Sequence, residues 1–312
     1  MTSSCRPSKI AIIGAGRVGT SFAYALMIRK IISEIVLIDI EKNKVKGEVM
    51  DLNHGLAYAE NLKIYGGDFS DCKNADYIVI TAGASQKPSE TRIDLINKNL
   101  TILKSMIPSI LKYNNTAKII LVSNPVDILT YITLKISGLP GNQVFGSGTV
   151  LDTSRFKFLL GQHFQVSPDS VDAFIVGEHG DSEVAIFSEA QIAGIPLKNF
   201  PNYSKKSMKK IYEETKNAAY EVIKYKGSTH YAIGLVLTEI IEAMHHNEHQ
   251  VLPVSSLLNG EFDLKNIALS LPCTVGSNGI EKTLEIKMNK TELKAFQNSA
   301  KKLKNIIKTL KI

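Results

Sequence analysis

The sequence predicts an α/β fold with a doubly wound parallel sheet in the first half of the chain and an α+β arrangement in the second. Two observations indicate this: short β-branched apolar runs alternate with helical patterns up to about residue 146, and the pattern changes after it. The composition, with 44% of 312 residues hydrophobic and 21% charged, is that of a globular chain. We expect one domain over residues 1–146 and a second over residues 147–312.

The elements of the first half follow from periodicity. Five segments have the near-continuous apolar character of strands buried on both faces. They are Lys9–Ile13, Ile35–Ile38, Leu62–Tyr65, Tyr77–Ile80 and Lys118–Val122. Apolar residues at helical spacing predict helices over Ser21–Ile32 and Asn97–Leu111. This alternation predicts parallel strands joined by crossover helices.

The second half has longer helical stretches between shorter strands, which is typical of an α+β domain. The predicted helices are Thr153–Gln162, Ser204–Lys224, Thr229–His245 and Lys290–Leu310. The predicted strands are Val171–Val176, Val251–Leu257, Ile267–Thr274 and Leu284–Ile286.

A Gly-x-Gly-x-x-Gly motif follows the first predicted strand and opens a helix. Gly14 allows a tight turn, Gly16 lets the backbone approach a pyrophosphate, and Gly19 lets the helix pack closely on the strand. Asp39 ends the next predicted strand, twenty residues after Gly19. A carboxylate there accepts hydrogen bonds from a ribose 2′-hydroxyl and repels a 2′-phosphate. The context predicts a Rossmann-type domain that binds NAD in preference to NADP.

A charged segment of the second half, GEHGDSE, has His179 near its centre. Upstream, Asp152 and Arg155 lie three residues apart at a predicted helix start and therefore on one face. Such a pair can supply a carboxylate for the histidine and a guanidinium for an anion. The alternatives are an ordinary hydrogen-bonded loop histidine and a surface ion pair worth a few tenths of a kcal/mol.

The segment from Gly83 to Arg92 contains glycine, proline and polar residues after a predicted buried strand, which indicates a loop. Parallel sheets bind ligands at the carboxyl ends of their strands, so Gln86 and Arg92 are candidates for ligand contact by position. A loop of this composition also exists without any function.

Histidines near residue 245 resemble a metal site, since His245 and His249 would share a helical face if the helix continued. His246 and Glu248 lie beside them, but there is no cysteine partner and no His-Glu-x-x-His order. We therefore expect no metal.

Charge and hydropathy exclude other classes of partner. Lysine clusters at residues 205–210 and 301–311 lack interleaved aromatic residues, so the net charge of +7 predicts no nucleic-acid binding. No apolar stretch approaches a membrane span, and the start lacks a secretory signal. With three isolated cysteines and no disulfide framework, we expect a cytoplasmic protein.

Eight motifs together resemble the lactate/malate dehydrogenase family, and within it the bacterial L-lactate dehydrogenases. In chain order they are GAGRVG, Asp39, MDLNHG, TAGASQKPSETR, VSNPVD, GSGTVLDTSRF, GEHGDSE and KGSTHYAIG. The C-terminal segment from Gly279 to Leu310 resembles that family's terminal strand and helix.

The resemblance implies reversible reduction of pyruvate to (S)-lactate with NADH. It implies catalytic roles for three residues: His179 donates and accepts the proton, Asp152 orients the His179 ring, and Arg92 arrives on a closing loop to polarise the carbonyl. The expected substrate-binding residues are Gln86, Arg92, Asn124, Arg155 and Thr229. The expected cofactor-binding residues are Gly14, Gly16, Arg17, Val18, Gly19, Asp39, Ala82, Gly83, Asn124, Ser147 and Ile233.

Gln86 sets the expected substrate within this family. A malate dehydrogenase is expected to carry arginine there, to pair with the second carboxylate of oxaloacetate, and a neutral glutamine leaves that charge unpaired. Pyruvate is therefore expected, with a related malate-type 2-hydroxy acid dehydrogenase as the alternative. A non-catalytic NAD-binding protein would be expected to lack His179 or Arg155, and both are present.

The resemblance also implies a homo-oligomer, expected to be a tetramer. Many bacterial members bind fructose 1,6-bisphosphate on paired Arg and His side chains at positions that here are Lys157 and Asp172. Lysine lacks the forked donor geometry that suits phosphate, and a carboxylate repels the anion. We expect activation by this sugar phosphate to be weak or absent.

Overall fold

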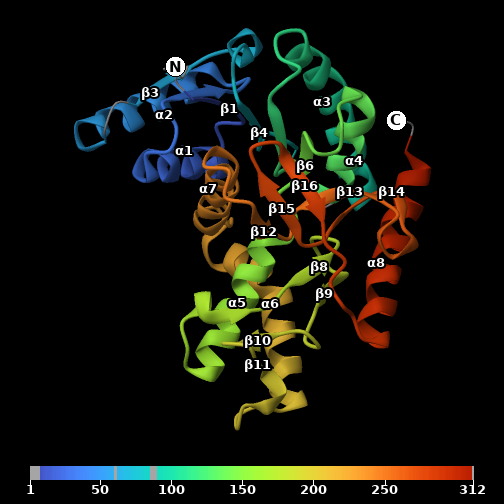
Figure 1. The fold of residues 1–312 in the computed structure, drawn as a ribbon. Helices are drawn as coiled ribbons and strands as arrows, with labels where there is room; N and C mark the ends of the chain where they lie inside the picture. The colour runs from blue at the N-terminus through green and yellow to red at the C-terminus, as the bar shows by residue number, and fades with distance from the viewer. Residues whose placement is uncertain (1–7, 60–61, 85–89, 311–312) are drawn as a thin grey trace, which may run out of the picture.

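The computed structural model describes residues 8–59, 62–84 and 90–310. Its main feature is a ten-stranded sheet with the strand order β3-β2-β1-β4-β5-β6-β13-β14-β8-β9. The first six positions hold parallel strands, which confirms the doubly wound arrangement (Figure 1). They are β1 (Lys9–Ile13), β2 (Glu34–Ile38), β3 (Lys63–Gly66), β4 (Tyr77–Ile80), β5 (Lys118–Leu121) and β6 (Val144–Gly146).

Helices cover both faces of the parallel strands. One face carries α1 (Arg17–Arg29), α2 (Lys42–His54) and α7 (Tyr231–His245), whose buried side chains pack with Ile10, Ile12 and Leu37. The other face carries α3 (Arg92–Leu111), α4 (Val126–Ser137) and α8 (Lys290–Thr309). In Figure 1, α1 and α7 lie side by side, and α8 runs down the opposite edge.

Two of these helices, α2 and α4, were not predicted by periodicity. In α2 only Val45 and Leu52 are buried, so its apolar stripe is thin. In α4 nine consecutive residues from Val126 to Leu134 are buried, polar ones such as Asp127 and Thr130 among them, so the sequence does not divide into an apolar buried face and a polar exposed face.

The sheet continues into the second half of the chain through antiparallel strands. The pairing of Gly146 with Ser255 joins β6 to β13. The added strands are β13 (Ser255–Asn259), β14 (Lys265–Ser270), β8 (Ile175–Gly177) and β9 (Glu183–Ala185). Two small sheets flank them: β7 (Val171–Asp172), β10 (Gln191–Ile192) and β11 (Ile195–Pro196) in one, and β12 (Gln250–Leu252), β15 (Cys273–Gly276) and β16 (Gly279–Thr283) in the other.

A third core lies between α5 (Val150–Phe164) and α6 (Lys205–Lys226), at the bottom of Figure 1. Short 3-10 turns complete the chain at Leu56–Tyr58, Phe69–Cys72, Pro168–Ser170, Leu197–Asn199 and Glu261–Asp263.

Five predictions for the second half need correction. The strand predicted at Leu284–Ile286 is wrong, because β16 ends at Thr283 and the chain then runs without strand pairing to α8. Three predicted strands are each two shorter ones: residues 171–176, 251–257 and 267–274 divide at residues 173–174, at Pro253 and at Pro272. Proline cannot donate to a strand ladder, which explains two of these breaks. Finally, α7 begins at Tyr231, not at Thr229.

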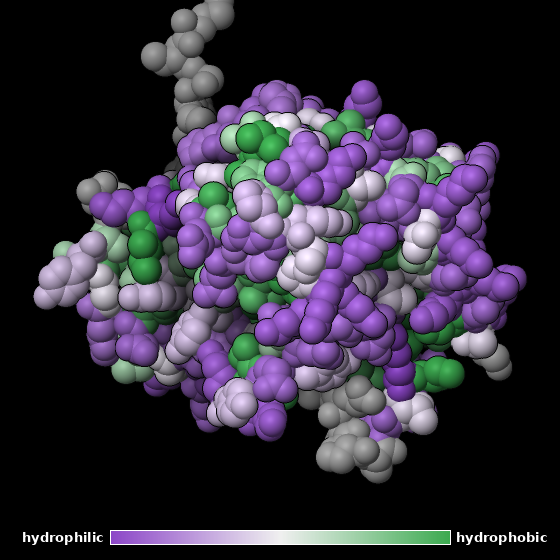
Figure 2. All heavy atoms as spheres, turned by 90° about the horizontal axis from the view of Figure 1, so that it is seen from below, coloured by the Kyte–Doolittle hydropathy of each residue, from purple (hydrophilic) through white to green (hydrophobic). Residues whose placement is uncertain are grey.

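The surface seen from below is covered mainly by hydrophilic side chains, and its hydrophobic patches are small and separated (Figure 2). Within the described parts of the chain, none of the helices combines the length and the apolar character needed to cross a membrane.

Candidate active site

The turn after β1 is shaped by close backbone contacts at two glycines. Gly14 has φ +112°, and a Cβ there would lie 2.5 Å from the nitrogen of Ala82. A Cβ at Gly19 would lie 2.0 Å from the Gly14 carbonyl oxygen. At Gly16, by contrast, an added Cβ meets nothing within 4 Å. The turn therefore packs tightly on its inner side and opens at Gly16 toward a ligand.

The opening at Gly16 fits a dinucleotide. Gly16 is the N-cap of α1, and no side chain caps that helix end, so its N–H groups are available to a pyrophosphate. A cavity of about 930 Å³ extends from there. It is lined by the predicted cofactor residues Gly14, Gly16, Arg17, Val18, Gly19, Asp39, Ala82 and Gly83, and by Thr229.

Asp39 also lines this cavity and directly follows β2. One carboxylate oxygen accepts a hydrogen bond from Ala15 N at 2.7 Å, and the other accepts from Glu41 N at 3.1 Å. These contacts hold the carboxylate at the carboxyl end of the sheet. Each oxygen retains a second lone pair for a ribose hydroxyl.

Asn99 links the loops that follow β4 and β5, a role that the sequence analysis did not assign. Its side chain is buried, accepts from Ala84 N at 2.7 Å and donates to the Asn124 carbonyl at 3.1 Å. The predicted contact Asn124 is exposed at this edge. Ser147, after β6, is buried, and its N–H donates to Leu121 O at 2.8 Å. The carboxyl ends of the neighbouring strands β5 and β6 are thus followed by the predicted polar residues Asn124 and Ser147.

The imidazole of His179 is oriented by a carboxylate. Its Nδ1 lies 2.5 Å from Oδ2 of Asp152, which is almost fully buried on α5. Burial opposes a charge on the ring, but the Asp152 carboxylate outweighs it and raises the pKa of His179 to about 9. The ring is therefore protonated at neutral pH, and its Nε2 is the atom left to face a substrate.

Arg155 shares the same carboxylate. Its Nη1 donates to Asp152 Oδ1 at 2.8 Å, and its side chain is 16% exposed. Burial favours the neutral acid, yet the charges of His179 and Arg155 hold the pKa of Asp152 below its usual value. The surface ion pair considered as the alternative is excluded, because both partners belong to a largely buried triad.

Asp127 is a further member of this cluster that the sequence analysis missed, although it ends the VSNPVD motif. It is buried, and its Oδ2 accepts from the backbone N–H of His179 at 2.8 Å while Oδ1 accepts from Ser255 Oγ at 2.6 Å. Burial raises the pKa of Asp127 to about 6. Asp127 therefore anchors the histidine loop to the start of α4.

Glu183 is the second missed carboxyl group. It lies on β9, is 4% exposed, and its Oε1 has no hydrogen-bond partner among the described residues. Burial, together with the Asp152 charge, raises the pKa of Glu183 to about 8. At neutral pH Glu183 is therefore a neutral carboxylic acid and adds no second negative charge beside the His179–Asp152 pair.

Arg92 also reaches this cluster. It is the first residue of α3, and its guanidinium makes an ion pair with the buried Glu178, the residue before His179. Gln86 lies outside the described residues. Thr229 precedes α7 and lines the cofactor cavity, while Ile233 is buried in the first turn of α7.

The histidines near residue 245 are arranged differently from the helical face considered above. Because α7 ends at His245, His249 does not continue its face. His249 Nδ1 instead lies 2.6 Å from Glu281 Oε2, and its Nε2 lies 3.1 Å from Asn247 Nδ2. In the described ranges no three metal-binding side chains come together.

Comparisons with known proteins agree with this geometry. The lactate/malate dehydrogenase NAD binding domain matches residues 8–146, and the lactate/malate dehydrogenase alpha/beta C-terminal domain matches residues 149–311. An L-lactate dehydrogenase from Acetivibrio thermocellus is 51% identical over 309 residues, covering 97% of this chain and 98% of that protein. One from Clostridium botulinum (strain Loch Maree / Type A3) is 48% identical over 305 residues, covering 96% of each.

The fold is also similar to that of a solved structure. The minor L-lactate dehydrogenase from Enterococcus mundtii, in its ligands-bound form, has a TM-score of 0.95 and 38% identity, covering 98% of this chain and 99% of that one. Two family models that together span nearly the whole chain, and relatives near 50% identity, confirm the resemblance carried by the eight motifs. The chain belongs to the lactate/malate dehydrogenase family, and its cofactor is NAD.

Proposed function

We propose that this enzyme is an NAD-dependent L-lactate dehydrogenase that reduces pyruvate reversibly to (S)-lactate. The observation that carries the proposal is the buried triad in which Asp152 bonds both the His179 ring at 2.5 Å and the Arg155 guanidinium at 2.8 Å. One carboxylate thus fixes a proton donor and an anion-binding group relative to each other. The relatives described above are named L-lactate dehydrogenases.

The histidine supplies the proton of the reaction. When bound, the nicotinamide delivers or takes up the hydride at the substrate carbon. Because Asp152 occupies Nδ1, Nε2 of His179 gives its proton to the ketone oxygen and recovers it in the reverse direction. The raised pKa keeps this proton on the ring before pyruvate is reduced.

Two arginines orient the substrate. Arg155 uses Nη1 for Asp152, so its remaining N–H donors can bind the substrate carboxylate in forked geometry. Arg92 stabilises the negative charge that develops on the carbonyl oxygen. Asn124 and Thr229 complete the substrate pocket.

The cofactor is held by the turn after β1 and by Asp39. The cavity and the uncapped start of α1 support pyrophosphate binding along Gly14 to Gly19. Ala82, Gly83, Ser147 and Ile233 contact the cofactor further along the sheet edge. Asp39 makes the enzyme prefer NADH to NADPH.

The substrate choice is tested by NADH oxidation with pyruvate and with oxaloacetate. We expect kcat/KM to favour pyruvate by at least about tenfold, since Gln86 offers no countercharge to a second carboxylate. Gln86→Arg should shift the ratio toward oxaloacetate. Preference of the unmodified enzyme for oxaloacetate would establish the malate-type alternative instead.

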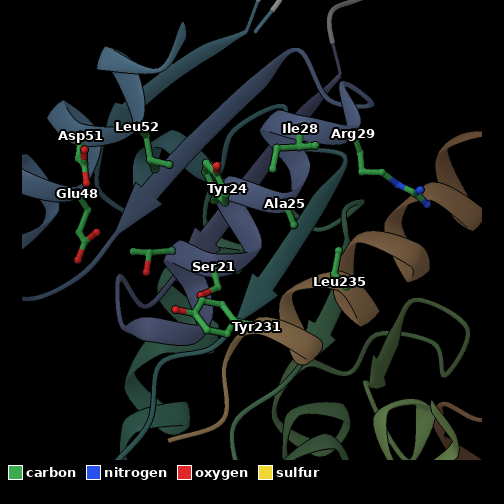
Figure 3. Close-up of a pocket in the computed structure, with 11 residues that line it drawn as sticks. Ser21, Tyr24, Ala25, Ile28, Arg29, Glu48, Asp51, Leu52, Tyr231 and Leu235 are labelled. Atoms are coloured by element: carbon green, nitrogen blue, oxygen red, sulfur yellow. The ribbon is translucent and has the colours of Figure 1, made fainter. Parts of the chain in front are cut away.

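The assembly we propose is a homotetramer, each chain folding as units 1–146 and 147–312. Support comes from an apolar hollow of about 450 Å³ between α1, α2 and α7 (Figure 3). Tyr24, Ile28, Tyr231 and Leu235 line it, and each is at least 54% exposed. Light scattering on the intact enzyme and on Leu235→Glu tests whether this face joins subunits.

Weak or absent activation by fructose 1,6-bisphosphate is supported by the surroundings of Lys157. Burial lowers its pKa, and the Asp172 and Asp169 carboxylates act in the opposite direction within the same chain. Pyruvate saturation with and without millimolar activator tests this proposal. A tenfold fall of KM, about 1.4 kcal/mol of coupling, would refute it.

We place the enzyme in the cytoplasm. Both described cysteines, Cys72 and Cys273, are buried free thiols, which suits a reducing compartment.

A further inference from the structure

Arg92 is held at the start of α3 by local structure. Thr91 and Asp94 form a capping box, in which Thr91 N donates to Asp94 Oδ2 at 3.0 Å and Asp94 N donates to Thr91 Oγ1 at 3.2 Å. The backbone of Arg92 is therefore fixed as the first helical residue. Its side chain remains 40% exposed, so the capping box alone does not determine where the guanidinium lies.

Glu178 determines that position. Arg92 Nη2 donates to Oε1 of Glu178, whose side chain is only 3% exposed. The other oxygen, Oε2, accepts from the Ser182 hydroxyl. A buried carboxylate held on one side by a hydroxyl is a rigid partner for a long, flexible arginine.

The backbone of Glu178 is tied to the C-terminal helix. Its N–H donates to Ser299 Oγ on α8 at 2.9 Å, and the hydroxyls of Ser299 and Ser182 lie 3.1 Å apart. Ser299 is fully buried. The backbone at Glu178 is thus fixed by α8 on one side and, through the next residue His179, by Asp127 on the other.

We propose that Glu178 is a positioning residue that holds the Arg92 guanidinium in place for the reaction, through a carboxylate that precedes His179 in the sequence. The inference rests on the proposed function, in which Arg92 stabilises charge on the substrate oxygen. The ion pair uses Nη2, and the guanidinium has further N–H donors for that oxygen. By confining a flexible side chain, Glu178 lowers the entropy that the transition state must otherwise lose.

The test begins with pyruvate reduction by the unmodified enzyme and by Glu178→Gln, which keeps the shape and removes the charge. We expect kcat/KM for pyruvate to fall about tenfold or more, while the Kd for NADH changes less than about twofold. Glu292→Gln is the matched control. Glu292 is also buried, and it accepts from Phe187 N at 3.0 Å and from the Ser188 hydroxyl at 2.6 Å, away from the triad. Loss of the Glu292 charge should lower Tm and leave kcat/KM for pyruvate unchanged.

A double-mutant cycle separates positioning from a structural role. If Glu178 acts through Arg92, adding Glu178→Gln to Arg92→Gln should reduce kcat/KM by less than about twofold further. Independent, multiplicative effects would overturn the inference. Should Glu178→Gln fail to fold, Ser182→Ala carries the same cycle with a smaller expected loss of about threefold, because it frees only one carboxylate oxygen.

The outcomes distinguish this inference from the proposed function. No pyruvate reduction by the unmodified enzyme would overturn both. An active enzyme whose Glu178→Gln variant is equally active would overturn the inference alone.

Discussion

The turn at Gly14 to Gly19 and the cluster around His179 lie in the same molecule but are built by different physics. The turn depends on sterics, because a Cβ added at Gly14 or Gly19 would lie within 3 Å of the backbone of Ala82 or of Gly14 itself. The cluster joins groups far apart in sequence, such as His179 with Asp127, 52 residues away, and Glu178 with Ser299, 121 residues away. Its geometry depends on charge and hydrogen bonding in a buried setting.

This difference teaches which substitutions each region tolerates. Adding one methyl group should damage the turn, whereas the cluster should be sensitive to neutral substitutions that keep shape and remove charge or a proton. Four experiments test that contrast.

The largest effect is expected for His179→Asn. Removing the proton donor should lower kcat for pyruvate reduction by about 10³-fold or more. NADH binding should be kept, because His179 is not among the residues that line the cofactor cavity. Stopped-flow turnover and NADH fluorescence titration measure the two. His163→Asn serves as control, since His163 is a half-buried histidine whose Nε2 lies 2.9 Å from Asn202 O. Near-normal turnover of the His179 variant would sink the assignment.

The next effect concerns pH. Reduction needs protonated His179, and Asp152 raises its pKa from 6.5 to about 9, so kcat/KM for pyruvate should decline only as pH rises toward 9. In Asp152→Asn the attraction is lost while burial still disfavours the charge, so the decline should move to pH 6.5 or below. At pH 8 the variant should be at least about tenfold slower. An alkaline limit that stays near 9 would show that Asp152 does not set this pKa.

A smaller effect is expected from a matched pair of glycine substitutions. Gly19→Ala places a Cβ 2.0 Å from the Gly14 oxygen and should cost roughly 1–3 kcal/mol of unfolding free energy. Gly16→Ala meets no protein atom within 4 Å, and Gly16 has φ −78°, so it should keep Tm and weaken only NADH binding. Urea unfolding and NADH titration give both quantities. Equal loss of stability in the two variants would contradict the steric explanation.

The smallest effect is a pH-dependent change of stability at Glu183. Its pKa is raised from 4.5 to about 8, so the folded state binds this proton more tightly than the unfolded state. The resulting stabilisation is complete below pH 4.5 and is lost as pH rises toward 8. Glu183→Gln should therefore have a Tm above that of the wild type by a few degrees at pH 9 and a much smaller advantage at pH 5. The exposed Glu189→Gln is the control, and a Tm difference that does not grow with pH would mean that Glu183 is paired and ionised.

The accuracy of the sequence predictions follows the same division. β1 and β4 were predicted with their observed bounds, because strands buried on both faces are continuously apolar. The helix α4 was missed because it is buried from Val126 to Leu134, its polar residues included, and so lacks an exposed polar face over this stretch. The residues of the triad were candidates from the sequence pattern, but their roles came only through the resemblance, because spacing alone left the pair Asp152 and Arg155 open to a surface reading.

The sequence by itself therefore determined the features that a short stretch of residues specifies: the parallel strands, the glycine turn and Asp39 at the end of β2. Tertiary structure decided that Asp127, Glu178 and Glu183 surround His179, and that Arg92 meets a buried carboxylate. The physical reason is that hydrophobic periodicity and backbone requirements, such as the positive φ of Gly14, belong to a short stretch of sequence. The charge state of a buried group instead depends on partners and desolvation that exist only after distant segments have packed together.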